Sequence, residues 1–321
     1  MVRGRERVLT LPSSETRVFD ELVASWNAEC PLGSQVKVEA RCFANGRGTA
    51  YYTMGLWSSE GKIFSRESVK GQSDVDGRVA TDTLQLAHLV NGFQLRITVI
   101  STDTGETPKL KFVSVALHHR GIPAPVTAAG DLPDKLLPVP QRSQLGYEGS
   151  TGWCSPTSTS MILAYWSAKL KRPELDVPVP QVAEGVYDRN WPGTGNWPFN
   201  TAFAGSFPGM RAYVTRLNTL DEVGQWIGAG VPVALSVDLP LLNGDKSSPP
   251  SGHIVVVVGF TRDGRVVVND PWPNPQGENR LQKIFPRSQV EEGWANSLRT
   301  VYLIYPEGYE KPVTRWHHWE E

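Results

Sequence analysis

The chain has 321 residues, of which 40% are hydrophobic and 20% are charged, so it has apolar material for about two packed domains. Its 32 basic and 33 acidic residues give a formal net charge of -1, which excludes recognition of nucleic acid or an anionic membrane through overall charge. No stretch approaches the roughly 20 apolar residues of a membrane helix, and the first residues lack the apolar core of a secretory signal. For the chain as given we expect no membrane span and a cytoplasmic location, although a removed leader would leave no trace.

Residues 16–120 carry only β signals. Apolar and polar residues alternate in QVKVEARCF (35–43) and FQLRITVIS (93–101), and KLKFVSVAL (109–117) supplies a further strand. Turns rich in Gly, Ser and Asp separate these segments. Their spacing predicts a β-sandwich of about 100 residues as the N-terminal domain.

Two of the three cysteines, Cys30 and Cys42, lie in this region and are the only plausible disulfide pair. The seven steps from Gln35 to Cys42 span roughly 23 Å of extended strand, well beyond disulfide reach. We therefore expect both thiols to be reduced. Cys42 is in phase with Val36 and Val38, which predicts a buried strand residue.

A segment rich in Pro, Ala and Gly, GIPAPVTAAGDLPD, predicts a linker over residues 121–135 and a C-terminal half that folds by itself. After it the pattern becomes mixed. We expect a helix over about 155–170 and a second helix within 218–230, capped by Asn218 or Thr219 and ended by Gly228 or Gly230. Strands follow in VPVALSVDL, HIVVVVGF and RVVVND. The fold class is therefore α+β, with a second domain over residues 136–306 and a tail over 307–321.

Cys154 lies where the first of these helices begins. Pro156 suits a first helical turn because its missing N–H would have no intrahelical partner there. A thiol at this position faces unpaired N–H groups and the positive end of the helix dipole, which favour the thiolate. The alternative is a packed cysteine behind Trp153, because free cysteine is often buried.

A thiolate nucleophile also needs a base, and His253 is the candidate among six histidines because it opens the strand HIVVVVGF. The following strand ends in Asn269 and Asp270, either of which could orient the imidazole. The order Cys, His, then Asn or Asp is that of papain-like enzymes. The set favours a Cys154–His253–Asp270 triad over a buried structural cysteine, which would need neither partner.

The hairpin between these two strands tests that triad. A two-residue turn at Asp263-Gly264 would set Val257 opposite Asp270 and leave His253 four residues, or roughly 13 Å, from that partner. That is too far for a hydrogen bond. We therefore predict an irregular hairpin, with a bulge or a wider loop, and an Asp270 oxygen within about 3.5 Å of a His253 ring nitrogen.

An oxyanion hole needs a side-chain amide just upstream of the nucleophile, together with backbone N–H groups. Gln141 and Gln144 are the candidates. We favour Gln144, ten residues before Cys154, over the alternative of an ordinary loop glutamine.

The stretch NWPGTGNWPFNTAF (190–203) places aromatic and amide side chains among glycines and prolines. We interpret it as a loop at the wall of a cleft, although aromatic residues packed under a loop are at least as common. The candidate substrate contacts are Trp153, Asn196, Trp197 and Asn200.

From about residue 136 to 306 the chain resembles the papain-like peptidases related to bacteriocin-leader processing enzymes, cysteine peptidase family thirty-nine. The resemblance lies in five segments in the same order: LLPVPQRSQ, GWCSPTSTSMILAYW, GTGNWPFNTAFA, SGHIVVVVGF and VVVNDP. It implies Cys154 as nucleophile, His253 as base and acid, Asp270 as the orienting residue and Gln144 in the oxyanion hole. The chain departs from the leader-processing enzymes because it has no transporter half and no phosphate-binding loop. Cleavage of double-glycine leaders is therefore not expected.

The combined prediction is a cysteine peptidase or amide hydrolase that acts on a peptide or protein through a thioester, with no cofactor and no metal. Two alternatives stay open. The same thiol could transfer the acyl group to an amine, or the sandwich could bind a glycan or cell-wall surface through exposed aromatics such as Trp57, beside an inactive hydrolase fold.

Overall fold

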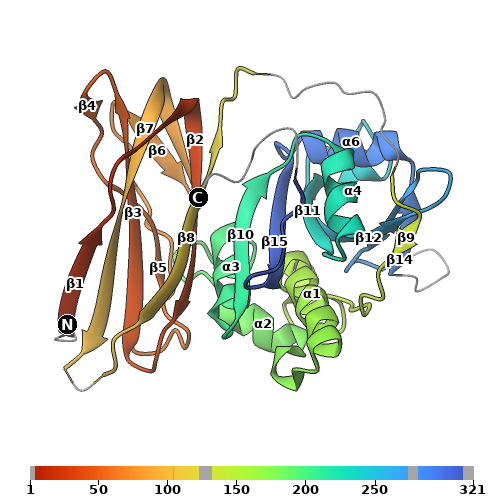
Figure 1. The fold of residues 1–321 in the computed structure, drawn as a ribbon, viewed down its shortest axis with the longest axis horizontal. Helices are drawn as coiled ribbons and strands as arrows, with labels where there is room; N and C mark the ends of the chain where they lie inside the picture. Colours follow the sequence, from red (N-terminus) through yellow and green to blue (C-terminus); the bar gives the residue numbers. More distant parts are fainter. Residues whose placement is uncertain (1–3, 104, 123–131, 274–280, 314–321) are drawn as a thin grey trace. The chain divides into compact units, whose positions relative to one another are not determined.

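The computed structural model describes residues 4–103, 105–122, 132–273 and 281–313, and the chain divides into two compact units (Figure 1). The strand-rich unit comprises residues 1–123 and 183–214, and the mixed unit comprises residues 124–182 and 215–321. Two of the divisions fall inside single elements, the second helix and the tenth strand. Most of the expected linker, residues 123–131, lies outside the described residues.

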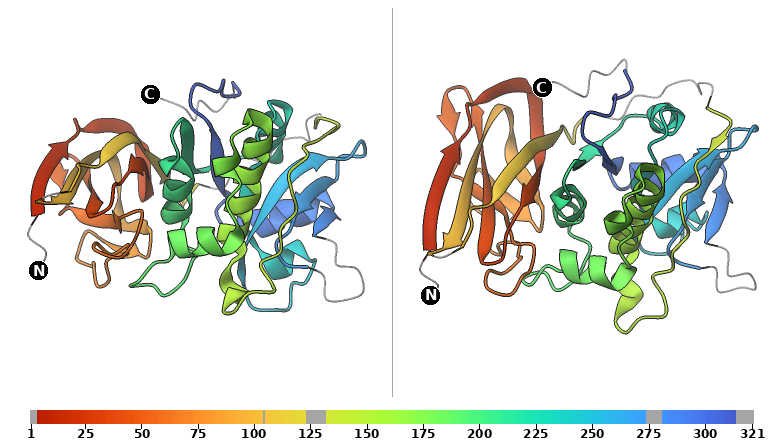
Figure 2. Two further views of the ribbon diagram at one scale, coloured as in Figure 1. Left: turned by 90° about the horizontal axis from the view of Figure 1, so that it is seen from below. Right: turned by 60° about the horizontal axis from the view of Figure 1, so that its bottom comes forward.

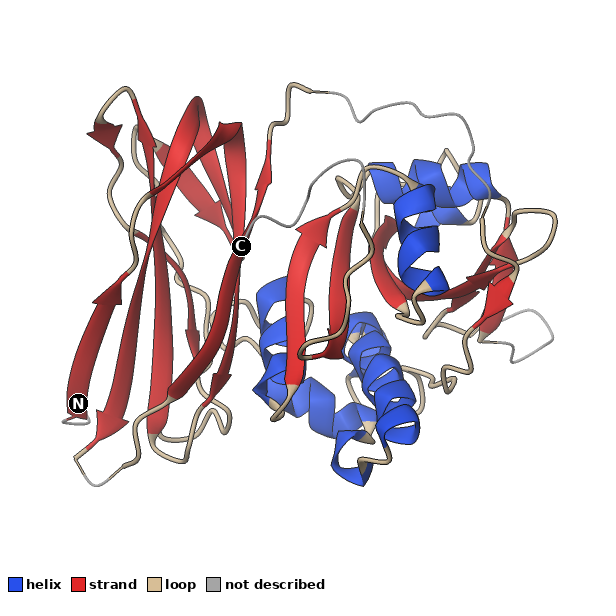
Figure 3. Cartoon of the chain, in the orientation of Figure 1, coloured by secondary structure: helices blue, strands red, loops and turns tan. Residues whose placement is uncertain are grey.

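Antiparallel strands make up the first part of the strand-rich unit (Figure 3). The strands are β1 (Gly4–Thr10), β2 (Ser14–Glu29), β3 (Ser34–Ala44), β4 (Arg47–Gly48), β5 (Tyr52–Trp57), β6 (Gly77–Ala80), β7 (Thr83–Thr102) and β8 (Lys109–His118). Hydrogen bonds join all eight in one sheet, because the long β2 and β7 each pair with several neighbours. Figure 2 shows this sheet curved about its own core. The prediction of an all-β N-terminal region is confirmed.

Burial along β3 follows the predicted alternation except at Glu39, which is 5% exposed and paired with Lys37 and Arg96. Val36, Val38 and Cys42 are fully buried, whereas Lys37 and Arg41 are partly exposed. Cys30 and Cys42 are both free thiols, as expected. Trp57 differs from its prediction as an exposed aromatic, because β5 turns its indole into the core.

The strand-rich unit also contains α3 (Trp197–Ser206) and most of β10 (Met210–Arg216), which the sequence assigned to the second domain. Phe199 of α3 lies against Trp26 and Trp57, with ring centroids 6.1 and 5.7 Å apart. The Asn27 amide accepts from the Ala212 N–H at 3.0 Å and donates to the Ala212 carbonyl at 2.7 Å. These residues therefore belong to the strand-rich unit, because they complete its core over β2.

The mixed unit contains helices and a second antiparallel sheet. Its elements, including α2, which is divided between the units, are β9 (Lys135–Leu136), η1 (Ser150–Gly152), α1 (Cys154–Leu170), η2 (Pro173–Leu175), α2 (Val179–Val186), α4 (Leu220–Gly228), β11 (Val233–Asp238), α5 (Leu239–Leu242), β12 (Gly252–Phe260), β13 (Val266–Asn269), β14 (Gln282–Phe285), α6 (Arg287–Ala295) and β15 (Thr300–Pro306). Within the unit the strands follow the order β15, β11, β12, β13, β14, with β9 added beside β12. The α+β class is confirmed.

Helix α1 is the central helix of the mixed unit, and all its residues from 155 to 167 are buried. Polar groups anchor it to the sheet: Ser155 bonds to the Tyr302 hydroxyl at 2.9 Å, and the Trp166 indole N–H donates to the Ile304 carbonyl at 2.8 Å. Both partners lie on β15. The run of hydroxyls in the sequence thus belongs to a buried helix, and Ser155 and Ser158 bond to neighbouring strands.

Helix α4 confirms the second predicted helix. The Thr219 hydroxyl accepts from the Glu222 N–H, and Gly228 is the last helical residue. Among the described residues, no helix is both long and apolar enough to cross a membrane.

Candidate active site

Cys154 is the first residue of α1, as predicted, and its side chain is half-buried. Trp153 occupies the N-cap position without a side-chain cap. The N–H groups of the first turn therefore have no intrahelical acceptor and point toward the thiol side of the helix end. This environment favours negative charge at Cys154.

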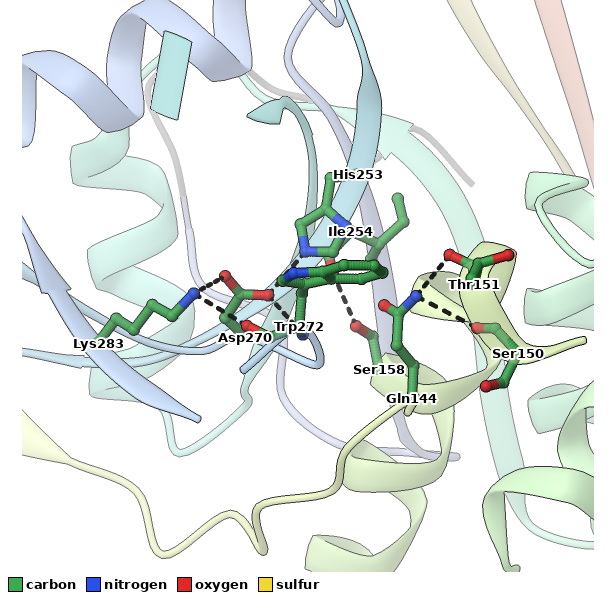
Figure 4. Close-up of polar contacts among 9 residues, drawn as sticks. All are labelled: Gln144, Ser150, Thr151, Ser158, His253, Ile254, Asp270, Trp272 and Lys283. Carbon is green, nitrogen blue, oxygen red and sulfur yellow. Dashed lines mark hydrogen bonds and ion pairs between the residues drawn. The ribbon is translucent and has the colours of Figure 1, made fainter. Parts of the chain in front are cut away.

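His253 and Asp270 come together as the sequence requires. His253 Nε2 lies 2.7 Å from Asp270 Oδ1, and the two side chains are 5% and 0% exposed (Figure 4). Because Nε2 is engaged by the carboxylate, Nδ1 is the ring nitrogen left to face the Cys154 thiol, and the thiol and the imidazole shift each other's pKa. The imidazole thus interacts with both the thiol and the carboxylate.

The β12–β13 hairpin is irregular, as predicted, and this irregularity brings Asp270 closer to His253 along the strand. A three-residue turn over 262–264 replaces the two-residue turn, with the Thr261 N–H bonded to the Arg265 carbonyl. A bulge between Val257 and Gly259 moves the register by one further residue, so Val257 pairs with Val268. If this register continues for two more positions, the residue opposite Asp270 lies about two residues from His253. That separation along the strand is roughly 7 Å, half of the separation in a regular hairpin.

Asn269, the alternative orienting residue, points elsewhere. Its amide donates to the Val139 carbonyl at 2.9 Å and accepts from the Gln282 side chain at 3.1 Å. Both ends of the amide are therefore satisfied within the sheet. Of the two candidates, Asp270 is the one that contacts His253.

Asp270 has two further partners that the sequence did not indicate. Its Oδ1 also accepts from the Trp272 N–H at 2.9 Å, and its Oδ2 lies 2.7 Å from Lys283 Nζ. Lys283 belongs to β14 and also donates to the Trp272 carbonyl at 2.9 Å. No local motif marks Lys283, because its position depends on the cross-strand register of β13 and β14.

The pKa values at the site reflect this arrangement. Burial alone would raise the pKa of Cys154, but its hydrogen bond and attraction to His253, together with backbone N–H groups, lower it below the ordinary thiol value. Burial would likewise lower the pKa of His253, but Asp270 and Cys154 raise it to about 9. The pKa of Asp270 is held below its usual range by His253 and Lys283, against the opposite effect of burial. The favoured state is a thiolate–imidazolium pair beside a carboxylate.

The other two thiols provide an internal contrast. Burial raises the pKa of both Cys30 and Cys42 to about 12. Neither has a cationic neighbour that favours its thiolate. Cys154 is thus the thiol whose surroundings favour nucleophilicity.

Gln144 is buried, 1% exposed, and sits beside the turn that leads to Cys154. Its Nε2 donates to the carbonyls of Thr151 at 2.7 Å and Ser150 at 3.3 Å, whereas its Oε1 has no partner (Figure 4). The amide therefore holds η1 in place, and its two N–H donors are directed at that turn. Gln141, the other candidate, is exposed.

Trp153 stacks on Tyr147, with ring centroids 5.8 Å apart and planes inclined by 23°. Tyr147 is 43% exposed. The pair forms an aromatic surface at the residue immediately before Cys154.

The other expected substrate contacts have structural roles in the strand-rich unit. Asn196 caps α3 by accepting from the Phe199 N–H and donates to Asp188, and Asn200 donates to two backbone carbonyls. Both are at most 1% exposed, and the Trp197 N–H donates to Asp82. The predicted loop is instead a helix from Trp197, and its signal was an Asn N-cap followed by Pro198 in the first turn. The side chains of Asn196 and Asn200 are thus buried and hydrogen-bonded, whereas that of Trp197 is partly exposed.

Among the residues described, no group of three or more His, Cys, Asp or Glu side chains is arranged to hold a metal ion.

A buried helix with a thiol at its N-terminus, packed on an antiparallel sheet that supplies a paired histidine and aspartate, has the architecture of a papain-like protein. Comparisons with known families give the assignment. Residues 136–301 match the model described as "Peptidase_C39 like family", and residues 8–117 match the "Peptidase C39 N-terminal domain". Because the first match covers more than half of the chain, the protein belongs to the C39-like peptidase family, which indicates a cysteine peptidase role.

Solved structures and curated proteins add the following. A crystal structure of a C39-like peptidase from Bacillus anthracis is 19% identical and covers 52% of this chain and 96% of its own, with a TM-score of 0.38. Vicilin from Corylus avellana is 11% identical over 94% of this chain and 80% of its own, with a TM-score of 0.10. No curated protein matches the chain. The assignment rests on the family models.

Proposed function

We propose that the protein is a cysteine peptidase in which Cys154, His253 and Asp270 cleave a peptide-like amide bond through a thioester. The observation that carries the proposal is the 2.7 Å contact between His253 Nε2 and the buried Asp270, combined with a thiol at a helix N-terminus whose pKa His253 lowers. A structural cysteine would need neither partner.

In the first step the Cys154 thiolate attacks the carbonyl carbon of the scissile amide. The C–S bond forms, and the carbonyl π electrons move to the oxygen. The Cys154 N–H, at the start of α1, is a donor for the resulting oxyanion. Gln144 is the second candidate donor, provided that substrate binding turns its amide away from one carbonyl of η1.

In the second step the C–N bond breaks and the leaving amine takes the proton from His253 Nδ1. The neutral imidazole then accepts a proton from water, whose oxygen attacks the thioester. The C–S bond breaks, the acid product leaves and the thiolate–imidazolium pair is restored. Throughout, Asp270 holds the imidazole through Nε2, so Nδ1 stays directed at the reacting atoms.

The stacked pair Tyr147 and Trp153 suggests which side chain the substrate presents near the thiol. Exposed aromatic faces favour apolar or aromatic groups, with stacking worth about 0.5–1.5 kcal/mol beyond area burial. We propose that the preferred substrate is a peptide with an apolar side chain close to the scissile bond.

The direct test is a diverse peptide library incubated with the wild-type protein and with Cys154→Ala. New amino termini and free acids should appear with wild type alone, clustered next to apolar residues. Cys30→Ala is the matched control, because it removes a buried thiol that takes no part in the proposed reaction. Cleavage that survives in Cys154→Ala would overturn the proposal, and amide-linked products in place of free acids would indicate acyl transfer.

A further inference from the structure

The carboxylate of Asp270 is held from two opposite sides by charged or chargeable groups. His253 contacts Oδ1, and Lys283 contacts Oδ2 at the same 2.7 Å separation. Trp272 connects the two sides, because its N–H donates to Oδ1 and its carbonyl accepts from Lys283 Nζ. Each carboxylate oxygen is therefore satisfied by a specific donor.

The position of Lys283 follows from strand register. Lys283 pairs with Val268, and Val268 and Asp270 point to the same face because they are two residues apart. Lys283 and Asp270 are thus diagonal neighbours across β13 and β14, at a separation that long side chains can span. The Lys283 side chain is only 19% exposed, so its charge is far less screened than that of a surface lysine.

A largely buried lysine–aspartate pair contributes little net stability to a sheet, because the loss of hydration of both ions offsets their attraction. Here the aspartate is also the partner of the candidate base. From this geometry we infer that Lys283 is a positioning residue that acts through Asp270 and sets both the orientation and the charge state of His253. The inference deepens the proposed function and rests on it.

Two physical effects follow from the contact. Lys283 Nζ holds Oδ2 and the Trp272 N–H holds Oδ1, which fixes the carboxylate plane so that Oδ1 stays directed at His253 Nε2. The Lys283 ammonium also partly neutralises the negative charge of Asp270, which weakens the attraction between that carboxylate and the imidazolium. Lys283 therefore keeps the imidazolium acidic enough to release its proton to a leaving amine.

The other charged groups around the pair do not duplicate this role. Cys154 approaches His253 from α1, and Asp270 and Lys283 come from the β13 and β14 side. On β11 the residue opposite His253 is Val237, whereas the Asp238 carboxylate bonds to Asn296 and Ser251. Besides His253 itself, Lys283 is the basic side chain that pairs with Asp270 in the described part of the chain.

Three substitutions separate charge from hydrogen bonding. Lys283→Met removes both, Lys283→Gln keeps a donor without charge, and Lys283→Arg keeps both. A unit charge about 6–7 Å from another shifts its titration by roughly one pH unit or more at an effective dielectric constant of about 20. We therefore expect the alkaline limb of activity to move upward by about one pH unit in the Met and Gln variants, and to stay in place in the Arg variant. Turnover at the optimum should fall about tenfold in the Met variant, the scale of one lost charged hydrogen bond.

The same shift can be measured without a substrate. The rate of Cys154 alkylation by iodoacetamide changes again at the pH where His253 loses its proton, so this second inflection should move upward with the activity limb. Lys246→Met is the matched control, because it removes an exposed lysine that pairs with Glu292 at 2.6 Å. It should leave both profiles unchanged.

The outcomes are decisive in either direction. If the alkylation inflection of Lys283→Met lies at the same pH as that of the wild type, Lys283 has a purely structural role and the inference is overturned. This holds even if the activity of the variant is reduced. If Lys283→Met shifts the alkylation inflection but the protein cleaves no peptide, the inference is supported and the proposed peptidase activity is contradicted.

Discussion

Ser158, one turn after Cys154, donates its hydroxyl to the carbonyl oxygen of Ile254 at 3.1 Å. Ile254 directly follows His253, so this buried bond connects the helix of the candidate nucleophile to the strand of the candidate base. Ser158→Ala should therefore lower turnover several-fold and decrease the free energy of unfolding by about 1–3 kcal/mol, because a buried carbonyl loses a donor. Peptide cleavage and chemical denaturation check the two effects.

The control for Ser158 lies on the same helix. The Ser160 hydroxyl donates to the Val177 carbonyl at 2.7 Å and does not contact the histidine strand. Ser160→Ala should cost a similar free energy of unfolding and leave turnover nearly unchanged. An equal loss of turnover in both variants would show that Ser158 acts through general stability.

The coupled pKa values of Cys154 and His253 predict a bell-shaped pH dependence. The thiolate–imidazolium pair forms above the lowered pKa of Cys154 and is lost as the pH rises through the His253 pKa of about 9. Activity should accordingly rise at a pH below that of an ordinary thiol and decline near pH 9. Iodoacetamide at a pH below the range in which an ordinary thiol titrates should label Cys154 in the folded protein, and Cys30 and Cys42 should react after unfolding. Labelling that follows an ordinary thiol titration would contradict the pairing.

Asp270→Ala should reduce turnover by about a hundredfold, because the imidazole loses the group that orients it. Asp270→Asn should be milder, about tenfold, since an amide oxygen can still accept from His253 Nε2. Combining Asp270→Asn with Lys283→Met should recover part of that loss, because it removes a lysine left without a counter-charge. Steady-state kinetics on the single and double variants check these values, and equal defects in Ala and Asn would exclude an orienting hydrogen bond.

Gln144→Ala distinguishes an oxyanion donor from a residue that only holds η1. A donor aimed at the oxyanion contributes roughly 3 kcal/mol, so turnover should fall about a hundredfold while Cys154 alkylation stays nearly unchanged. If alkylation falls in parallel, the amide serves only to hold the turn that positions Cys154. Gln141→Ala is the control, and a larger loss there would move the role three residues upstream.

Residues 132–321 expressed alone should aggregate or lack a cooperative unfolding transition, contrary to the independence expected from the linker composition. Phe199 would lose Trp26 and Trp57, and the Ala212 backbone would lose both hydrogen bonds to Asn27. Calorimetry of the fragment beside the full chain checks this. A soluble fragment with full-rate Cys154 labelling would show that these contacts are dispensable.

Local patterns were sufficient for much of the fold and for the main side chains of the site. The start of α1 and the cap of α4 depend on neighbouring residues, and the structure agrees with both. The alternation along β3 holds except at Glu39, which is buried. The hairpin irregularity was predictable because a regular register would have separated His253 from Asp270. The catalytic roles themselves stay predictions until the substitutions above are measured.

The features that sequence reasoning missed depend on contacts between distant segments. Lys283 reaches Asp270 through a sheet register that its own neighbours do not specify. Trp57 looked available because its strand gives no indication that Phe199, more than 140 residues later, packs against it. The reach of α3 into the N-terminal core likewise depends on Gly205, where any Cβ would lie 2.1 Å from the Asn27 amide nitrogen.

The path of the chain, which enters the strand-rich unit a second time over residues 183–214, has a consequence for how such proteins evolve. A gene fusion that exchanged the first 120 residues for an unrelated domain would leave the apolar face of α3 without its counterpart. Recombination at a single junction is therefore disfavoured, and the N-terminal domain and the peptidase segment must change together. Among relatives, substitutions at the positions of Trp26, Asn27 and Trp57 should be correlated with substitutions in α3 and β10, so the two modules should be inherited as one genetic unit.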